Sequence, residues 1–410
     1  MGDLVRLRSN RNYMIIMVAE TLSNTGLWFG ILANLHFLEL HVPSNFLKSL
    51  ILVAGPILGI LVSPKAGVVI DRRSKKSVMM AGSLVQLASA IVMIGAMSLE
   101  SVPMMVAGLL IASIGNSFYI PVLRSVIPLV VDKSSLVQAN AVYTNVVTIT
   151  RIAATAIAGW LLTVLPLYGM YWAALGIYLV MTGLRYMLLF EEHPTPLEKK
   201  SRDQISFLQV FPLLRSHPAL MVLVGASTLV FLFLGGFNLL ILKFSEFQQD
   251  PALKGWLYTI EGIGVLIGGF VVRRWFAGGN LLRRNVALLS GIAASAYILH
   301  FAAQRWAVVC GFALFGLMIG CWLPTSGAIP QLIVPEGIRG RYFAFQEMWN
   351  RTVFQLALLL TGGMLDIAGL PGYMIILAGT ILTGFLVMFG WIVSYKLHVE
   401  APKSQKSVAA

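Results

Sequence analysis

Polar residues that interrupt long apolar stretches carry most of the chemical information in this sequence. Glu20, Asn24 and Trp28 recur at every fourth position within the apolar stretch 12–40, so they share one face of a helix. A carboxyl group in partly apolar surroundings has its charged form disfavoured, which lets it exchange protons near neutral pH. We therefore expect Glu20 to carry a proton or to bind a cationic substrate. The alternative is that Glu20 only hydrogen-bonds within a helix bundle, for instance to Arg151.

Charged groups in the hydrocarbon region of a membrane are costly unless they are paired or hydrated, so each one marks a candidate site. Besides Glu20, these residues are Arg151, Glu261, Glu347 and Arg351. Glu347 and Arg351 lie four positions apart with the acid nearer the N-terminus, which is the favourable order for an ion pair on one helix. We expect this pair to neutralise itself and to serve the scaffold.

A further set of amide and aromatic side chains is suited to line a cavity between helices. Its members are Asn116, Tyr119, Asn145, Asn238 and Trp322. Such groups in a mostly apolar cavity suit large amphipathic ligands, because they combine apolar contact with a few orienting hydrogen bonds. Each of them can equally serve to hold neighbouring helices together.

The elements that must position these residues are long apolar helices. The chain has 410 residues, of which 58% are hydrophobic and 11% charged, and a soluble domain could not bury so much apolar surface. Apolar runs of roughly 20 residues are long enough to cross a bilayer as helices. The expected spans are 12–40, 46–70, 77–98, 103–130, 138–165, 168–190, 216–243, 252–273, 284–302, 305–333, 342–366 and 371–395. We therefore predict an all-α polytopic membrane protein with twelve transmembrane helices.

The twelve spans form two sets of six. The predicted parts are a six-helix bundle over 1–190, a cytoplasmic linker with an interfacial helix over 191–214, and a second six-helix bundle with a short cytoplasmic tail over 215–410. Gly67 and Gly269 stand at corresponding places in the two sets, and Pro128 and Pro330 repeat this match at the same offset. Duplication of a six-helix unit leaves such a repeat, and transporters built in this way bind their substrate between the two halves.

Charge and motif content restrict the function further. The net charge is +13, and the basic residues gather in the connections at alternate ends of the spans, which places those connections and both termini in the cytoplasm. We therefore expect a protein of the cell membrane, in contact with lipid, that binds no nucleic acid. The sequence lacks a Gly-x-x-x-x-Gly-Lys-Ser/Thr motif for ATP, a cluster of His and Cys for a metal, and a nucleophile with a base at plausible spacing. We expect no enzyme activity, and no cofactor beyond a proton gradient as the energy source.

The stretch between the second and third spans resembles a signature of the major facilitator superfamily, Gly-x-x-x-Asp-Arg-x-Gly-Arg-Lys. The matching residues are Gly67, Asp71, Arg72, Lys75 and Lys76, while Ser74 stands where glycine is usual. The fourth span and its exit resemble the macrolide-efflux branch of the drug:proton antiporters, which also includes siderophore exporters. The matching residues there are Phe118, Pro121, Pro128, Leu136, Ala139 and Asn140. The fifth span lacks the glycine-proline pair expected of antiporters, which leaves direction and coupling open.

The resemblance also implies roles for particular residues. In this fold the first span lines the central cavity, which would bring Glu20 to the substrate. The fifth and eighth spans face one another, so a contact between Arg151 and Glu261 is expected to form in one conformational state and to break in the other. In the outward-facing state, Asp71 would accept hydrogen bonds at the start of the eleventh span near Gly340 and Arg341, and would act with its neighbours as a conformational latch.

Together these features predict a secondary active transporter that works as a monomer by alternating access. We expect it to export amphipathic drugs or metabolites in exchange for protons, as multidrug-resistance antiporters do. The alternatives within transport are export of a siderophore or a lipid-like metabolite, and uptake by symport. The alternatives from other classes are a membrane-embedded enzyme and a receptor derived from a transporter.

Overall fold

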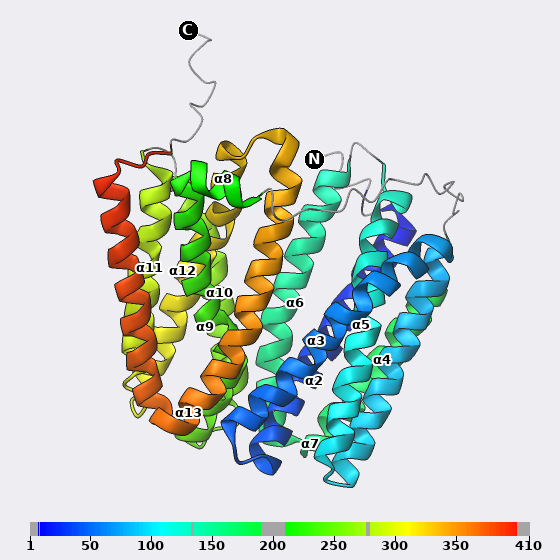
Figure 1. Cartoon of the computed structure of the whole chain (residues 1–410). Coiled ribbons are helices and arrows are strands. Elements are labelled where there is room, and N and C mark those ends of the chain that lie inside the picture. The colour runs from blue at the N-terminus through cyan, green and yellow to red at the C-terminus, as the bar shows by residue number, and fades with distance from the viewer. Residues whose placement is uncertain (1–6, 8, 133–134, 190–209, 276–278, 400–410) are drawn as a thin grey trace. The chain divides into compact units, whose positions relative to one another are not determined.

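The computed structural model of this chain describes Leu7 and residues 9–132, 135–189, 210–275 and 279–399, and this part consists of helices and their connections (Figure 1). The prediction of an all-α protein is confirmed for these residues. The chain divides into two compact units. Unit 1 comprises Met1–Leu197 with Gln249–Thr259, and unit 2 comprises Glu198–Gln248 with Ile260–Ala410. The sequence-based division had assigned Gln249–Thr259 to the second half of the chain.

Unit 1 contains six long helices, each of which is long and apolar enough to cross a membrane. They are α2 (Arg11–His41), α3 (Asn45–Arg72), α4 (Lys75–Ser98), α5 (Val102–Val130), α6 (Leu136–Val164) and α7 (Leu167–Tyr186). The connections between them are only a few residues long. Consecutive helices therefore run in opposite directions.

Unit 2 contains one short helix and several long ones. They are α8 (Val210–Ser216), α9 (Pro218–Gln248), the greater part of α10 (Leu253–Trp275), α11 (Leu281–Leu299), α12 (Arg305–Ile333) and α13 (Glu336–Ser394). In α13 two helices are joined at Gly369, which has φ +67° and lies two residues before Pro371. Glycine adopts this left-handed conformation readily because it has no Cβ atom.

The described residues thus form twelve long helical segments when the two parts of α13 are counted separately, in agreement with the twelve predicted spans. Ten helices in the described part are long and apolar enough to span a membrane, and α11 is not among them. The first turns of α11 carry Arg283, Arg284 and Asn285, which shorten its apolar part. Helix α8 falls within the stretch expected to lie at the membrane interface, whereas residues 191–209 of the predicted linker lie outside the described residues.

Side-chain caps fix where several helices of unit 1 begin. Asn10, Ser44, Ser74 and Ser101 each accept a hydrogen bond from the backbone N–H three residues further along. A cap of this kind satisfies one of the backbone donors that a helix start leaves without a partner.

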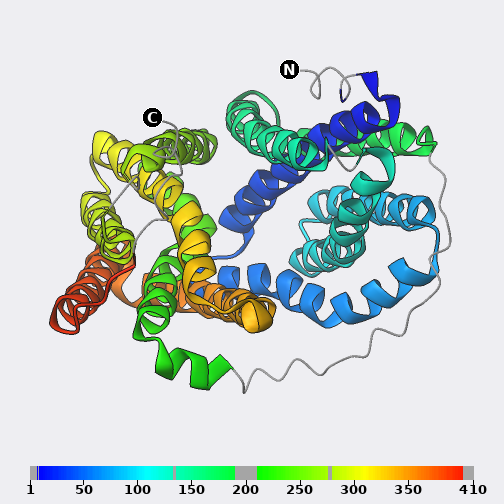
Figure 2. The same ribbon diagram turned by 90° about the horizontal axis from the view of Figure 1, so that it is seen from above.

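Helix packing within unit 1 brings polar side chains from distant parts of the sequence together. Figure 2 shows this unit from above, with α2 and α3 running obliquely across the view and α4 beside α5. Helix α4 packs on α5 and α7, α2 packs on α6 and α7, and α3 packs mainly on α5. The middle of α2 therefore shares its surroundings with α4, α5 and α7.

Unit 2 is held together by aromatic stacking and by glycines. The rings of Phe233 and Phe315 stack with centroids 3.9 Å apart, which ties α9 to α12. On α10 and α12, Gly264, Gly268, Gly316 and Gly320 lie so close to the facing backbone that a Cβ atom at any of them would approach it to 2.7 Å or less. Two small-x-x-x-small pairs thus allow these helices to pack at close range, as is common in membranes.

Candidate functional site

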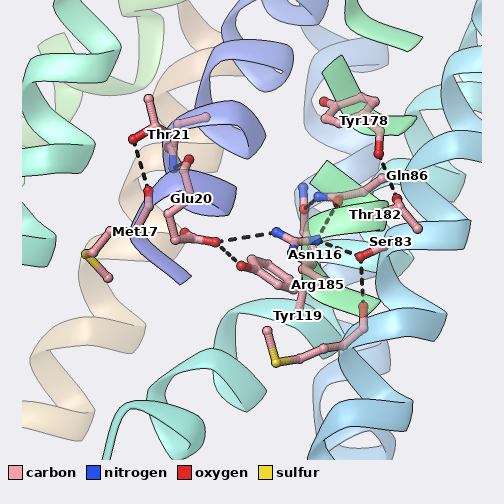
Figure 3. Close-up of polar contacts among 12 residues, drawn as sticks. Met17, Glu20, Thr21, Ser83, Gln86, Asn116, Tyr119, Tyr178, Thr182 and Arg185 are labelled. Carbon is pink, nitrogen blue, oxygen red and sulfur yellow. Dashed lines mark hydrogen bonds and ion pairs between the residues drawn. The ribbon is translucent and has the colours of Figure 1, made fainter. Parts of the chain in front are cut away.

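Glu20 lies near the middle of α2 and is almost completely buried in unit 1, with 2% of its surface exposed. Its carboxylate accepts a hydrogen bond from the hydroxyl of Tyr119 on α5 and pairs with Arg185 on α7, whose Nη2 lies 3.4 Å from Oε1 (Figure 3). Tyr143 on α6 also faces this carboxylate. A buried carboxylate is stable only when such donors replace the water that it has lost.

Arg185 is the centre of this polar cluster and is itself 1% exposed. Its Nη1 donates to the hydroxyl of Ser83 at 2.7 Å and to Oε1 of Gln86 at 3.4 Å, both on α4. Its guanidinium lies over the ring of Tyr119 at 3.9 Å from the ring centroid, a favourable cation–π geometry. Two helices other than α2, namely α4 and α5, therefore hold the cation in place in addition to its contact with Glu20.

The cluster extends beyond Arg185 toward a cavity. The Nε2 of Gln86 donates to Oδ1 of Asn116 on α5 at 3.2 Å (Figure 3). Asn116 lines a cavity of about 300 Å³ within unit 1. A continuous series of polar contacts thus joins Glu20, through Arg185 and Gln86, to the wall of this cavity.

The partner of Glu20 differs from the one suggested by the sequence. The sequence suggests Arg151 as an example of a partner within the bundle. The contact is instead made by Arg185, because α7 packs on α2. Sequence reasoning missed Arg185 because it stands near the end of an expected span, where a cation is ordinarily taken to reach the interface. Arg185 nevertheless is a charged residue within an apolar helix, and the same feature identified Glu20 in the sequence.

Asn24 and Trp28, expected to share a face with Glu20, do not join its polar cluster. The Nδ2 of Asn24 donates to the backbone carbonyl of Glu20 at 2.9 Å, within the same helix. Trp28 packs edge-to-face on Tyr258 at the start of α10, with ring centroids 5.2 Å apart. The predicted stripe therefore serves two different purposes along α2.

Two of the five predicted cavity residues belong to the site, and three do not. Asn116 lines the cavity and Tyr119 contacts Glu20, as described above. Asn145 on α6 is exposed in unit 1. In unit 2, Asn238 is half-buried, and Trp322 is buried in edge-to-face contact with Phe231.

The other predicted charges are on helices α6, α10 and α13. Arg151 is half-buried on α6 in unit 1, whereas Glu261 is 5% exposed on α10 in unit 2, and their expected contact stays a prediction. Glu347 and Arg351 form an ion pair on α13, with Nε 2.8 Å from Oε1. Both side chains of this pair are more than half exposed in unit 2.

The expected latch at the end of α3 is described only in part. The side chain of Asp71 lies outside the described residues, and Arg72 is exposed. Lys75 donates to the backbone carbonyl of Ile70 at 2.8 Å, and the ammonium of Lys76 lies 5.3 Å from the ring centroid of Tyr186. Gly67 has open space around its Cα atom. The lysines thus contact groups of unit 1, and the latch stays a prediction.

A second charged cluster in unit 1 escaped the sequence analysis. Lys254, which is fully buried in the first turn of α10, donates to the carboxylate of Glu39 near the end of α2. His36 lies one turn earlier on α2, with Nδ1 2.8 Å from the same carboxylate oxygen. Close packing of α10 on α6 supports this contact, because Gly159 and Gly255 face each other without side chains.

Both units contain helices that are long and apolar enough to cross a membrane, and both bury charged residues. These features define a polytopic membrane protein. The family model of the Major Facilitator Superfamily matches residues 12–244, which is more than half of the chain. The chain therefore belongs to the Major Facilitator Superfamily, and it is a membrane transporter of that type.

Relatives agree with this assignment. The uncharacterised MFS-type transporter YfiS of Bacillus subtilis (strain 168) is 22% identical over 379 residues, which cover 87% of each chain. The solved structure of the nucleoside transporter NupG is similar with a TM-score of 0.74 and 14% identity, covering 93% of this chain and 99% of that one. A peptide transporter structure of the POT type matches with a TM-score of 0.75 and 12% identity, covering 94% of this chain and 95% of that one. At these identities the two structures show the fold alone.

Proposed function

We propose that this transporter exports amphipathic compounds in exchange for protons, and that Glu20 carries the proton. The observation that supports this proposal is the way in which Arg185 is held. When Glu20 is ionised, it pairs with Arg185. When Glu20 is protonated, the guanidinium keeps Ser83, Gln86 and the ring of Tyr119. The site therefore suits both protonation states without leaving a buried cation unpartnered.

The chemistry of the cluster favours a proton over a cationic cargo at this carboxylate. Arg185 already occupies the position beside Glu20 that an organic cation would need. A proton needs no such space, because it binds to an oxygen atom of the carboxylate. Transfer of one proton for each exported molecule would drive export against a concentration gradient, as alternating access requires.

A test of the proposal uses purified protein in liposomes with an imposed pH gradient and a panel of amphipathic compounds. We expect at least one compound to move against the proton flux. Glu20→Gln, which keeps the shape and the hydrogen-bonding capacity of the side chain, should abolish movement driven by the gradient. Counterflow exchange of the compound without a gradient should persist, because it needs no net proton transfer.

A matched control for this experiment is Glu347→Gln. It removes the same charge from an exposed ion pair in unit 2 and should leave gradient-driven transport close to that of the wild type. Transport by Glu20→Gln with an unchanged response to the gradient, in protein that elutes as one species, would exclude Glu20 as the proton carrier. Transport that requires protons and substrate to move in the same direction would establish symport.

A further inference from the structure

The cavity in unit 1 has a chemical character of its own. It has a volume of about 300 Å³ and is formed by α2, α3, α4, α5 and α7. Its lining contains no Asp, Glu, Lys, Arg or His residue. Apolar groups predominate, and the polar members are Asn34, Ser89, Ser113, Asn116, Tyr171 and Tyr178. A volume at the lower end of the range for ligand pockets, with a few fixed polar groups, suits a small uncharged molecule or part of a larger one.

Hydrogen bonds within the wall fix the shape of this cavity. The hydroxyl of Tyr171 donates to Oδ1 of Asn34 at 2.7 Å, which ties α7 to α2. The hydroxyl of Ser89 donates to the carbonyl of Gly108 at 2.9 Å, which ties α4 to α5. These polar side chains are used by the scaffold, so the cavity is preorganised and does not depend on a ligand for its form.

The hydrogen bonds of Asn116 connect the wall of the cavity to the surroundings of Glu20. Its Oδ1 accepts from Gln86, and the Oε1 of Gln86 accepts from Arg185. A ligand group that accepts a hydrogen bond from the Asn116 amide would shift the Asn116 side chain and, through it, the side chains of Gln86 and Arg185. The position of the guanidinium beside Glu20 would then depend on whether the cavity is occupied.

We propose that this cavity binds uncharged, mostly apolar molecules with a hydroxyl or carbonyl group, and that Asn116 and Gln86 connect its occupancy to Glu20. The binding part of the proposal stands on the cavity alone, whereas the connection rests on the proposed role of Glu20. Asn116 contacts the ligand, and Gln86 is a positioning residue that acts through Arg185. All residues that line the cavity belong to unit 1.

Cysteine labelling tests the binding part without any transport measurement. Ala112 lines the cavity, and Ala112→Cys would be placed in full-length protein that also carries Cys310→Ser and Cys321→Ala, in lipid nanodiscs. The probes are uncharged N-ethylmaleimide and a cationic trimethylammonium methanethiosulfonate, each normalised to its rate with free cysteine. We expect the uncharged probe to react about tenfold faster in these relative rates, because a charge enters an uncharged cavity at high cost. Equal relative rates, or no labelling by either probe, would overturn the proposal.

A pair of glycine variants shows whether the labelled space is this cavity. Gly30 lines the cavity, and a Cβ atom on it would have no neighbour within 4 Å, so Gly30→Leu is expected to place its side chain in the cavity. Gly176 on α7 also has open space but does not line the cavity, which makes Gly176→Leu a matched control. Gly30→Leu should slow labelling of Ala112→Cys severalfold, and Gly176→Leu should leave it unchanged. The same rate in both variants would place the reaction outside the cavity.

The connection to Glu20 is tested by the pH profile of proton flux in liposomes. Labelling Ala112→Cys with N-ethylmaleimide should shift the pH of half-maximal flux. The same protein with Gln86→Leu should be labelled at the same rate but show no shift, a difference that a purely structural role of Gln86 would not produce. An unchanged profile after labelling would overturn the connection. Absence of proton-coupled transport in the wild type would instead overturn the proposed function, and the labelling result would stand.

Discussion

Two carboxylates on the same helix of unit 1 are paired with cations in different ways. Glu20 and Arg185 are almost completely buried, with side chains 3% and 0% exposed. Glu39 is 17% exposed and is shared by buried Lys254 and by His36. Glu20 thus belongs to a cluster rich in neutral hydrogen-bonding groups. Glu39 is shared by an ammonium group and an imidazole ring.

The difference indicates which carboxylate is suited to change its charge. Loss of the charge on Glu20 leaves Arg185 with Ser83, Gln86 and an aromatic ring as partners. Loss of the charge on Glu39 removes the carboxylate to which the fully buried ammonium of Lys254 donates. Under the proposed function, Glu20 is therefore the carboxylate expected to change its charge, and Glu39 is expected to stay paired with Lys254.

Among the variants that test the two ion pairs, Arg185→Met is expected to lower the stability of the protein most. It leaves the Glu20 carboxylate buried without its cation, which typically costs about 3–5 kcal/mol of folding free energy. The purified variant should unfold at a much lower temperature than the wild type. Adding Glu20→Gln should restore most of the loss, because the orphaned charge is then removed. If the double variant is as unstable as the single one, the instability comes from lost packing and the ion pair is not its cause.

A smaller effect is expected from Lys254→Met, about 2 kcal/mol, because Glu39 is partly exposed and keeps His36. Thermal unfolding of Lys254→Met, Glu39→Gln and the double variant would measure the coupling between the two groups. We expect the effects to be strongly non-additive. Additive losses would show that Lys254 is stabilised mainly by groups other than Glu39.

Close helix packing next to the Glu39 cluster allows a third test. A Cβ atom on Gly159 would lie 2.6 Å from the Cα atom of Gly255, so Gly159→Ala should push α10 away from α6 and destabilise the protein by about 1 kcal/mol. Gly176→Ala adds the same methyl group where nothing is near and should be neutral or slightly stabilising, since alanine favours helices. Equal unfolding temperatures for the two variants would mean that the α6–α10 contact contributes little.

The sequence was informative about the fold and only partly about the site. Long apolar runs predict membrane helices because a bilayer requires a fixed length, and the repeated Gly and Pro positions predict two related halves. Glu20 was found because a carboxyl in an apolar helix is unusual. Its partner Arg185 and the Glu39–Lys254 contact were not found, because spacing along the chain does not reveal which helices pack together or how each is rotated. Cavities depend on the same information: the residue type of Asn116 predicted that it lines one, but the other walls of that cavity could not be predicted.

The smallest effect in the series is expected at the Glu347–Arg351 pair, which provides a reference for both buried clusters. The pair has good geometry at 2.8 Å, but its side chains are 63% and 61% exposed. Exposed ion pairs on one helix contribute only about 0.2–1 kcal/mol, because the surroundings replace most of the interaction when it is lost. Arg351→Met should therefore lower the unfolding temperature of the purified protein only slightly, and much less than Arg185→Met. A decrease in unfolding temperature as large as that of Arg185→Met would show that the membrane shields this pair more than its exposure in the chain indicates. Lipid would then contribute to the stability of this ion pair.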